Sequence, residues 1–432
     1  MSEPAALQTS QAARVVTIPR PESVNDLAIR RSFLEELGLK ILYLTGPASI
    51  PELADRLKLN YRTTDEIFRR IRDGLLCEVT SVSRNTPTLA MTTQGRARAL
   101  ELLSLNQYTG PTPVSLSSYV QQVGLQSVRK MAIHPPDIQK AFAHLVVDSK
   151  TLTQIGTALN SGTSIFLHGP TGSGKTTIAE TLTKVFAADK VWIPYAVEVD
   201  GEVIAVYDPI IHRKVEEPTA DVGDRRWVLC ERPTVLVGGE LTIEMLDLQF
   251  NGIAKFYEAP VQMKANNGVL IIDDFGRQRL RPDELLNRWV VPLDRHIDFL
   301  SLAGGKKIEM PFEMFVVFAT NMSPSELVDA AFLRRIQTKI RVGNISGAQF
   351  HEIFRRVAQS AKLQYDREVV DELIHVIQQS LHEPLRACQP RDIVNQIYWA
   401  AKYEGTPMKL DHNTIKRAVD AYFLPPGSDE EA

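Results

Sequence analysis

The chain has 432 residues, of which 44% are hydrophobic and 23% are charged; this is a globular composition in a chain too long for one ordinary core, so we expect two or three domains. The formal net charge of -3 excludes a general attraction to nucleic acid or anionic membrane and confines any basic surface to a local patch. The three cysteines are far apart and form no CxxC pair, which excludes a disulfide scaffold and a zinc ribbon.

The N-terminal sequence, MSEPAALQTS, has no basic start followed by an apolar stretch, so no export signal is visible. No apolar run approaches the roughly 18 residues of a membrane span. We therefore expect a cytoplasmic protein. Residues 1–23 are polar and contain two prolines, and we expect them to form a disordered tail.

Residues 24–110 are predicted to form a winged helix-turn-helix domain. Helical spacing of apolar residues covers 27–44, and Ser49 with Pro51 signals the start of the next helix. A further helix over 61–76 is followed by two β-type runs, CEVTSV and TPTLAM, and by a closing helix containing GRARALELL.

The second helix of a helix-turn-helix unit, here the predicted helix over 61–76, can enter the major groove of DNA. Three arginines, Arg62, Arg69 and Arg72, share one of its faces, and Arg84 falls at the wing tip. However, Asp65 interrupts the basic face, and residues 24–110 contain 12 Lys/Arg against 10 Asp/Glu. DNA-binding domains usually have a clearer basic surface, so docking of a protein, DNA binding and a purely structural role all remain open.

A Pro-, Gly- and Ser-rich stretch marks a linker over 111–124. Apolar strands then alternate with helices over 125–342, a pattern typical of an α/β domain whose parallel sheet has helices on both faces. Residues 343–425 are predicted to form a helical lid, with Val370, Leu373, Ile374, Ile377 and Leu381 on one stripe. We expect residues 426–432 to form a second disordered tail.

The stretch FLHGPTGSGKTT matches G-x-x-x-x-G-K-[ST], after a predicted buried strand and before a predicted helix. The glycines let backbone N–H groups point at phosphate oxygens, and the helix adds its positive N-terminal end. Lys175 is expected to contact the β and γ phosphates, and Thr176 to bind Mg²⁺. The predicted nucleotide-binding residues are Gly169, Pro170, Thr171, Gly172, Ser173, Gly174, Lys175, Thr176 and Thr177.

Two further predicted strands end in polar side chains. The strand VLII runs into Asp273, which is expected to orient Mg²⁺, and Asp274, which is expected to polarise the attacking water. Asn321 follows the strand FVVFAT and could bridge the γ-phosphate and that water. The alternatives are an acidic turn at the strand end for the two aspartates and a helix N-cap for Asn321.

The phosphate loop, LIIDD, FATN, DAAFLRRI and QPRDIVNQI occur in the order and rough spacing of AAA+ ATPases, which the chain resembles over about residues 125–424. The resemblance implies ATP and Mg²⁺ as cofactors and a hexameric ring. It also implies that Arg335, with Arg334 beside it, is the arginine finger that reaches the neighbouring subunit's site. Arg391 would be the sensor 2 arginine of the lid.

Two alternating stretches predict β-hairpins, one turning at Asp200-Gly201 and one at Ala303-Gly304-Gly305. The second resembles the pre-sensor-1 insertion of the AAA+ clade that includes MoxR-type chaperones, magnesium chelatase motor subunits and enhancer-binding activators. In that clade such hairpins press on the substrate protein. The alternative is a pair of ordinary surface hairpins.

These features predict an ATP-hydrolysing ring that remodels a protein client, with Asp274, Asn321, Arg334, Arg335 and Arg391 as catalytic residues. One alternative is a nucleotide-controlled DNA-binding regulator or initiator, and another is a scaffold that holds ATP without turnover. The usual glutamate of an Asp-Glu pair is replaced here by the shorter Asp274. We therefore expect hydrolysis to be slow.

Overall fold

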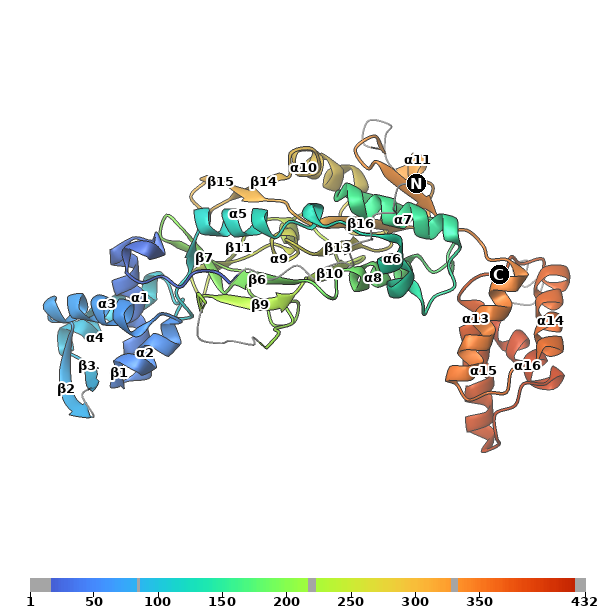
Figure 1. Ribbon diagram of the computed structural model, residues 1–432, viewed down its shortest axis with the longest axis horizontal. Helices are drawn as coiled ribbons and strands as arrows, with labels where there is room; N and C mark the ends of the chain where they lie inside the picture. Colours follow the sequence, from blue (N-terminus) through green and yellow to red (C-terminus); the bar gives the residue numbers. More distant parts are fainter. Residues whose placement is uncertain (1–16, 84–85, 217–222, 328–332, 424–432) are drawn as a thin grey trace, which may run out of the picture. The chain divides into compact units, whose positions relative to one another are not determined.

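The computed structural model describes residues 17–83, 86–216, 223–327 and 333–423 (Figure 1). Both predicted tails lie largely outside these residues, as does Arg84. The chain divides into two compact units: the first comprises Met1–Met131, Phe186–Ile271 and Gln278–Val316, and the second comprises Ala132–Val185, Ile272–Arg277 and Val317–Ala432. In the described part of the chain, no helix is long and apolar enough to cross a membrane.

The first unit begins with a small helical region that carries a three-stranded antiparallel sheet, in the strand order β1-β3-β2. As predicted, Ser49 caps a helix with Pro51 in its first turn, because its side chain and that of Glu52 form a reciprocal capping box. The elements are α1 (Arg31–Thr45), β1 (Ala48–Ser49), α2 (Ile50–Leu57), α3 (Tyr61–Asp73), β2 (Cys77–Ser83), β3 (Thr86–Met91) and α4 (Thr93–Leu105).

The first unit also contains a five-stranded sheet, which has the strand order β11-β12-β8-β7-β4. Both predicted hairpins are confirmed: β7 pairs with β8 around Asp200-Gly201, and β14 pairs with β15 across the glycine turn. Lys306 and Asp200 form an ion pair between the two hairpin turns. The elements are β4 (Val114–Ser115), α5 (Leu116–Leu125), β6 (Lys190–Pro194), β7 (Ala196–Val199), β8 (Glu202–Ala205), β9 (Trp227–Glu231), β11 (Gln249–Asn251), β12 (Phe256–Glu258), α9 (Val261–Lys264), α10 (Pro282–Arg295), β14 (Ile297–Ser301) and β15 (Lys307–Pro311).

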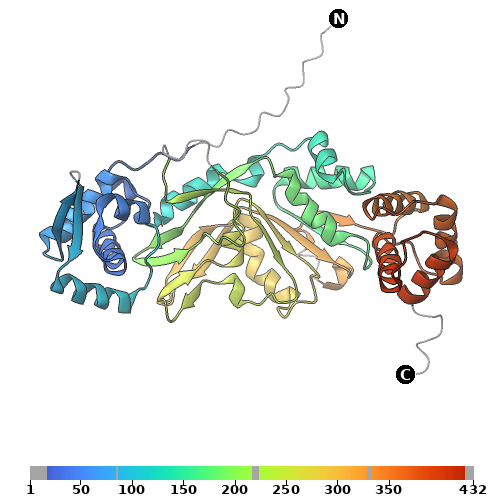
Figure 2. The same ribbon diagram turned by 90° about the horizontal axis from the view of Figure 1, so that it is seen from below.

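The main sheet has the strand order β10-β13-β16-β5-β17, and β17 runs parallel to β5. Its strands are β10 (Thr234–Val237), β13 (Val269–Ile272), β16 (Phe315–Thr320), β5 (Ser164–His168) and β17 (Thr338–Arg341). Every residue of β13 and β16 is buried, which explains the apolar sequence of β13 and of β16 as far as Ala319. With helices around it, this sheet confirms the predicted α/β class (Figure 2).

In the second unit, α6 (Pro135–Phe142), α7 (Ser149–Ser161) and α8 (Lys175–Val185) accompany β5, and α11 (Pro324–Leu327) follows β16. The last part is helical: α13 (Gly347–Ser360), α14 (Arg367–His375) with a π-helical turn at Val376–Ser380, α15 (Gln389–Glu404) and α16 (His412–Tyr422). The predicted stripe of α14 faces this helical core. Val370, Leu373 and Ile377 are buried there, with Ile374 and Leu381 partly buried against them.

Candidate nucleotide site

The predicted phosphate loop lies between β5 and α8. Three of its glycines have positive φ, at 151° for Gly169, 77° for Gly172 and 93° for Gly174. A Cβ added to Gly169 would lie 2.0 Å from the carbonyl oxygen of Val342. Side chains are therefore excluded here both by conformation and by close approach, which is the reason for the glycine-rich sequence.

Lys175 is the first residue of α8, and its side chain is only 8% exposed. Its Nζ donates to the carbonyl oxygens of Gly169, at 3.0 Å, and Pro170, at 2.9 Å. Burial lowers the pKa of this lysine, while the carboxylates of Asp273 and Asp274 act to raise it. A buried cation beside N–H groups of a glycine loop is a suitable partner for phosphate oxygens.

The two predicted magnesium ligands are in contact. Thr176 Oγ1 donates to Asp273 Oδ2 at 2.8 Å. Mg²⁺ is typically held by one or two protein oxygens together with water and substrate phosphates, so a hydroxyl and a carboxylate fit this ion. The described residues contain no group of three or more His, Cys, Asp or Glu side chains that could hold a metal by themselves.

Asp274 is exposed and has a left-handed backbone, with φ at 48°. Aspartate tolerates this conformation better than most residues because its short side chain can bond locally. The Asp274 N–H donates to Asp273 Oδ1 at 3.0 Å, and its carbonyl accepts from Arg277 N at 2.9 Å. The second acid therefore projects from a tight turn directly after the buried strand.

Asn321 lies beside the phosphate loop, where its Nδ2 donates to Thr171 Oγ1 at 3.3 Å. The preceding residue, Thr320, fixes the ends of two strands: its Oγ1 donates to the Phe275 carbonyl at 2.7 Å, and Phe275 N donates to the Ala319 carbonyl at 2.7 Å. These bonds explain how the amide and the two carboxylates come to face the same loop.

A cavity of about 670 Å³ joins these groups. Its polar end contains Thr171 to Thr177, Asp273, Asp274 and Asn321. Its other walls were not predicted from the sequence and come from residues 144–148 and from the helical part of the unit, including Ile345, Ile353, Arg356 and Val357. Arg356 donates to the carbonyls of Ala143, at 2.9 Å, and Leu145, at 3.2 Å. In the sequence, Arg356 looks only like the helical partner of Glu352.

The start of α15 contacts the phosphate loop. Cys388 N donates to the Gly172 carbonyl at 3.1 Å, and a Cβ on Gly172 would lie 2.5 Å from Cys388 Sγ. Arg391 lines the cavity one turn further along; its side chain is 67% exposed, and its Nε donates to Asp392 Oδ1 at 3.2 Å. The predicted lid arginine is thus brought to the site.

The two predicted finger residues do not line this cavity. Arg334 is exposed and Arg335 is half-buried, just before β17. Residues 328–332, which include the beginning of the AFLRRI motif, lie outside the described residues. The positions of Arg334 and Arg335 therefore do not support a role in the cavity of the same subunit. The predicted role, in the site of a neighbouring subunit, does not require either arginine to line this cavity.

Comparison with known proteins adds little to this picture. A family model described as a domain of unknown function (DUF8689) matches residues 346–421. No curated protein matches the chain. Among solved structures, the RuvB Holliday junction branch migration motor of Thermotoga maritima is 10% identical, with a TM-score of 0.37, covering 64% of this chain and 70% of that chain. A variant of that protein is 12% identical, with a TM-score of 0.36, covering 68% and 72%.

Proposed function

We propose that the chain is a Mg²⁺-dependent ATPase of the AAA+ type. The observation that carries this proposal is one cavity lined by a phosphate loop, the Thr176–Asp273 pair, Asp274 and Asn321. Bound Mg²⁺ would neutralise charge on the β and γ phosphates. Lys175 would hold the γ-phosphate, Asp274 would orient and polarise water, and Asn321 would position that water without adding charge.

We further propose that the active form is a head-to-tail ring, most simply a hexamer. Developing charge on the γ-phosphoryl group needs fixed cations, and the guanidinium group provides a planar, permanently charged fork. Arg391 would supply one from the lid, and Arg335 or Arg334 would supply another to the neighbouring subunit. A finger supplied in this way requires a heterologous interface, which closes into a ring.

The ring would act on a protein client. The hairpin β14–β15, with its glycine turn and its exposed Phe299, supports this proposal because it offers a partly apolar contact. The helical region of the first unit has the element order of a winged helix, and we propose that it docks a protein. Two of its four α3 arginines are neutralised locally: Arg69 pairs with Asp65 at 2.6 Å and Arg70 with Glu35 at 3.3 Å.

Phosphate release from ATP by the full chain tests the enzymatic proposal. We expect turnover by the wild type, and a loss of at least about 10²-fold in Lys175→Ala, the scale of removing one electrostatic contact to the transition state. Lys150→Ala, which alters an exposed lysine on α7, is the matched control and should behave as the wild type. Equal rates for the wild type and Lys175→Ala would overturn the proposal.

A further inference from the structure

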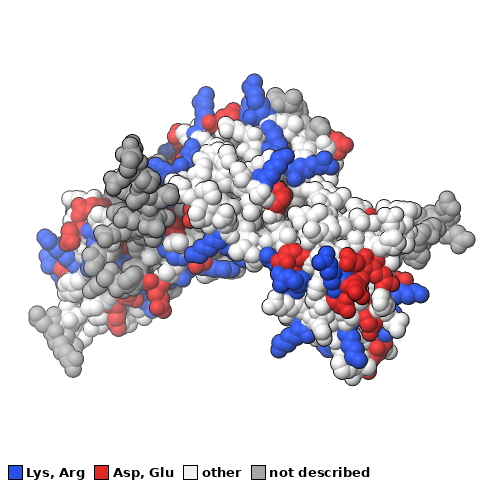
Figure 3. Space-filling view, turned by 45° about the vertical axis from the view of Figure 1, so that its right-hand side comes forward, with Lys and Arg blue, Asp and Glu red and all other residues white. Residues whose placement is uncertain are grey.

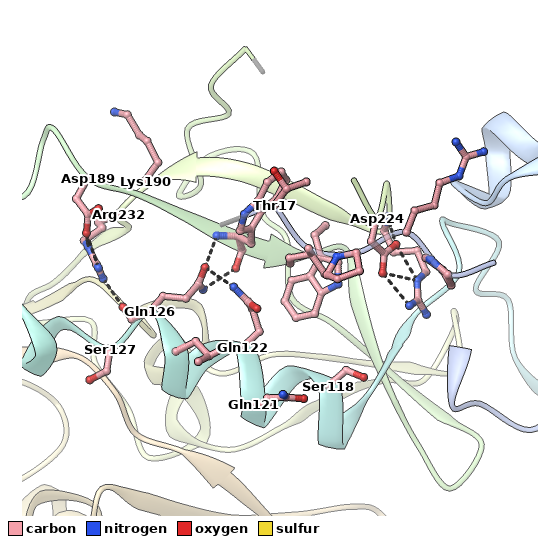
Figure 4. A pocket seen from close by; sticks show the side chains of 18 of the residues that line it. Thr17, Ser118, Gln121, Gln122, Gln126, Ser127, Asp189, Lys190, Asp224 and Arg232 are labelled. Carbon is pink, nitrogen blue, oxygen red and sulfur yellow. Dashed lines mark hydrogen bonds and ion pairs between the residues drawn. The ribbon is translucent and has the colours of Figure 1, made fainter. Parts of the chain in front are cut away.

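The first unit contains a second cavity, of about 710 Å³, which none of the predicted motifs explains. It lies between α5, the edge of β6 and the extended segment Thr17–Pro21. Figure 4 shows Gln122 and Gln126 facing Thr17 across the hollow, with the Asp189–Arg232 pair toward one end and Asp224 toward the other. We call this cavity the α5 groove.

The wall formed by α5 and the residue after it is rich in side-chain amides. Gln126 Oε1 accepts from Trp192 N at 2.7 Å, and its Nε2 donates to the Trp192 carbonyl at 2.9 Å. This amide pairs with a backbone peptide group on the edge of β6 as a neighbouring strand would. Gln122 donates to Gln126 at 3.0 Å, and Gln121 lies beside it in the groove. Gln126 Nε2 also donates to Asn267 Oδ1 at 3.1 Å, so the Gln126 amide is fully occupied. The amides of Gln121 and Gln122 are therefore the ones that offer donors and acceptors to a peptide backbone.

The charges of the α5 groove are unbalanced. Five basic and three acidic residues line it. Two of the carboxylates are occupied by buried arginines: Asp224 binds Arg226 through two oxygens, at 3.0 and 2.8 Å, and Asp189 binds Arg232 at 2.8 Å. The third, Asp26, accepts backbone N–H groups of Glu22 and Ser23 at 3.0 and 2.8 Å.

The remaining cations of the groove are Arg20, Lys130 and Lys190. Lys130 Nζ donates to the Gly124 carbonyl at 2.5 Å, and Lys190 Nζ donates to the Ala187 carbonyl at 2.9 Å with Glu231 further away, at 3.4 Å. These exposed or partly exposed cations suit carboxylates that arrive with a ligand.

The groove already accommodates extended backbone. Ile18 accepts from Asp224 N at 3.0 Å, and Pro19 forms an antiparallel bridge with Gly223. Its two indoles, by contrast, are hidden, because Trp192 is 6% and Trp227 4% exposed. Nucleic acid without sequence preference is normally held on exposed aromatic faces, so these observations favour a peptide over a nucleotide strand.

We propose that the α5 groove binds an extended acidic peptide segment of a protein partner. The amides of Gln121 and Gln122 would pair with the peptide backbone, and Arg20, Lys130 and Lys190 would pair with the carboxylates of the peptide. The interpretation of this partner as the remodelled client rests on the proposed function, but the binding itself does not require ATP.

Fluorescence anisotropy of the full chain with a fluorescein-labelled peptide of alternating glutamate and valine tests the proposal. We expect binding that weakens with salt, and a loss of about tenfold in the double variant Arg20→Glu, Lys130→Glu, since each reversal replaces an attraction by a repulsion. Lys307→Glu, an exposed lysine on β15 that does not line the groove, is the matched control and should bind as the wild type. Lys130→Ala, a milder change, should weaken binding by about threefold if the double variant does not fold.

Gln122→Ala separates backbone recognition from general charge attraction. We expect about a threefold loss that persists at high salt, because a hydrogen bond between neutral groups is not screened. Absent binding, equal binding of a lysine–valine peptide, or tighter binding of a labelled single-stranded oligonucleotide would each overturn the proposal. If the wild type binds the peptide but releases no phosphate, the ATPase proposal is overturned and the peptide-binding proposal stands. If it releases phosphate but does not bind the peptide, the peptide-binding proposal is overturned and the ATPase proposal stands.

Discussion

Lys175 in the phosphate loop and Lys40 in α1 are both nearly inaccessible to solvent, at 8% and 4% exposed. Their surroundings differ. Lys175 is held by two carbonyls and has two carboxylates close enough to favour its charge. Lys40 donates to the carbonyl of Asn106 at 2.9 Å, and burial lowers its pKa to about 8.

 The nearby carboxylate of Glu36 acts to raise that pKa, but burial outweighs it.

The difference shows what makes a buried charge useful. Around Lys175 the opposing charges and the glycine loop converge on a cavity, so the cost of burial is partly offset and a phosphate can complete the arrangement. Lys40 has a hydrogen-bonded carbonyl but does not line the nucleotide cavity, and its burial weakens the fold at neutral pH. Arg69 and Arg70 on the surface of α3 are a third case, because their carboxylate partners neutralise them in place. Figure 3 shows basic and acidic side chains next to one another in several places on a surface that is otherwise largely uncharged.

The largest expected effect tests whether the site around Lys175 is completed by a second subunit. Arg335→Ala should still bind ATP but lose phosphate release by about 10³-fold, the lower end for an arginine finger. Mixing it with inactive Lys175→Ala should restore activity, since about a quarter of randomly mixed interfaces combine an intact lysine with an intact arginine. Arg334→Ala, measured in parallel, shows which of the two arginines acts. A mixture that stays inactive would contradict a finger supplied by the neighbour.

The next effect tests the cost assigned to Lys40. Its pKa falls from 10.5 to about 8 on folding, so between these values the unfolded chain binds the extra proton and stability rises with pH. The cost is complete below pH 8 and amounts to roughly 3 kcal/mol. Lys40→Met should therefore raise the free energy of unfolding, relative to the wild type, most strongly near pH 7, and this gain should disappear toward pH 10. Urea unfolding at both pH values measures this difference, and a pH-independent difference would contradict the predicted shift.

A smaller effect concerns the carboxylates that face Lys175. Asp274→Glu should raise the phosphate-release rate, by up to about tenfold, or leave it unchanged, because a longer side chain can hold the attacking water more closely. The left-handed backbone at Asp274 opposes this gain, because that conformation suits aspartate better than glutamate. A collapse of the rate would show that the site is built around the shorter acid. Asp283→Glu, on the exposed start of α10, controls for the added methylene.

The smallest effect is expected at the paired arginines of α3. Duplex DNA binding by the full chain should be weak and should change little with salt, because few cations are available to displace counterions from phosphates. Arg69→Ala should leave that binding unchanged. A steep salt dependence that becomes shallower by about one unit in Arg69→Ala would instead support the DNA-binding regulator.

Much of the candidate nucleotide site could be predicted as a cluster of residues because its sequence signals are local. The glycine loop and the polar residues that follow two buried strands carry signals within a few residues, and parallel strands bring such ends together. The hairpins were likewise predictable from Asp200-Gly201 and the Ala303 turn. By contrast, the contact of Arg356 with the 143–145 carbonyls joins segments more than two hundred residues apart. Neither the periodicity nor the spacing of residues predicts such a contact between distant segments. For the same reason, the burial of Lys40 and the α5 groove could not be predicted from the sequence.

The contact between Cys388 and Gly172 also places a native cysteine where a fluorescent label would lie next to the phosphate loop. Cys77 and Cys230 are buried, and burial raises the pKa of their thiols to about 11 and about 12, which suppresses the reactive thiolate at neutral pH. Burial also raises the pKa of the Cys388 thiol, but Cys388 is half-exposed and therefore accessible to a reagent, and it lies against the loop that would close around phosphate. An environment-sensitive dye attached there, without any engineered cysteine, would turn the loading and emptying of the site into an optical signal that can be followed in real time.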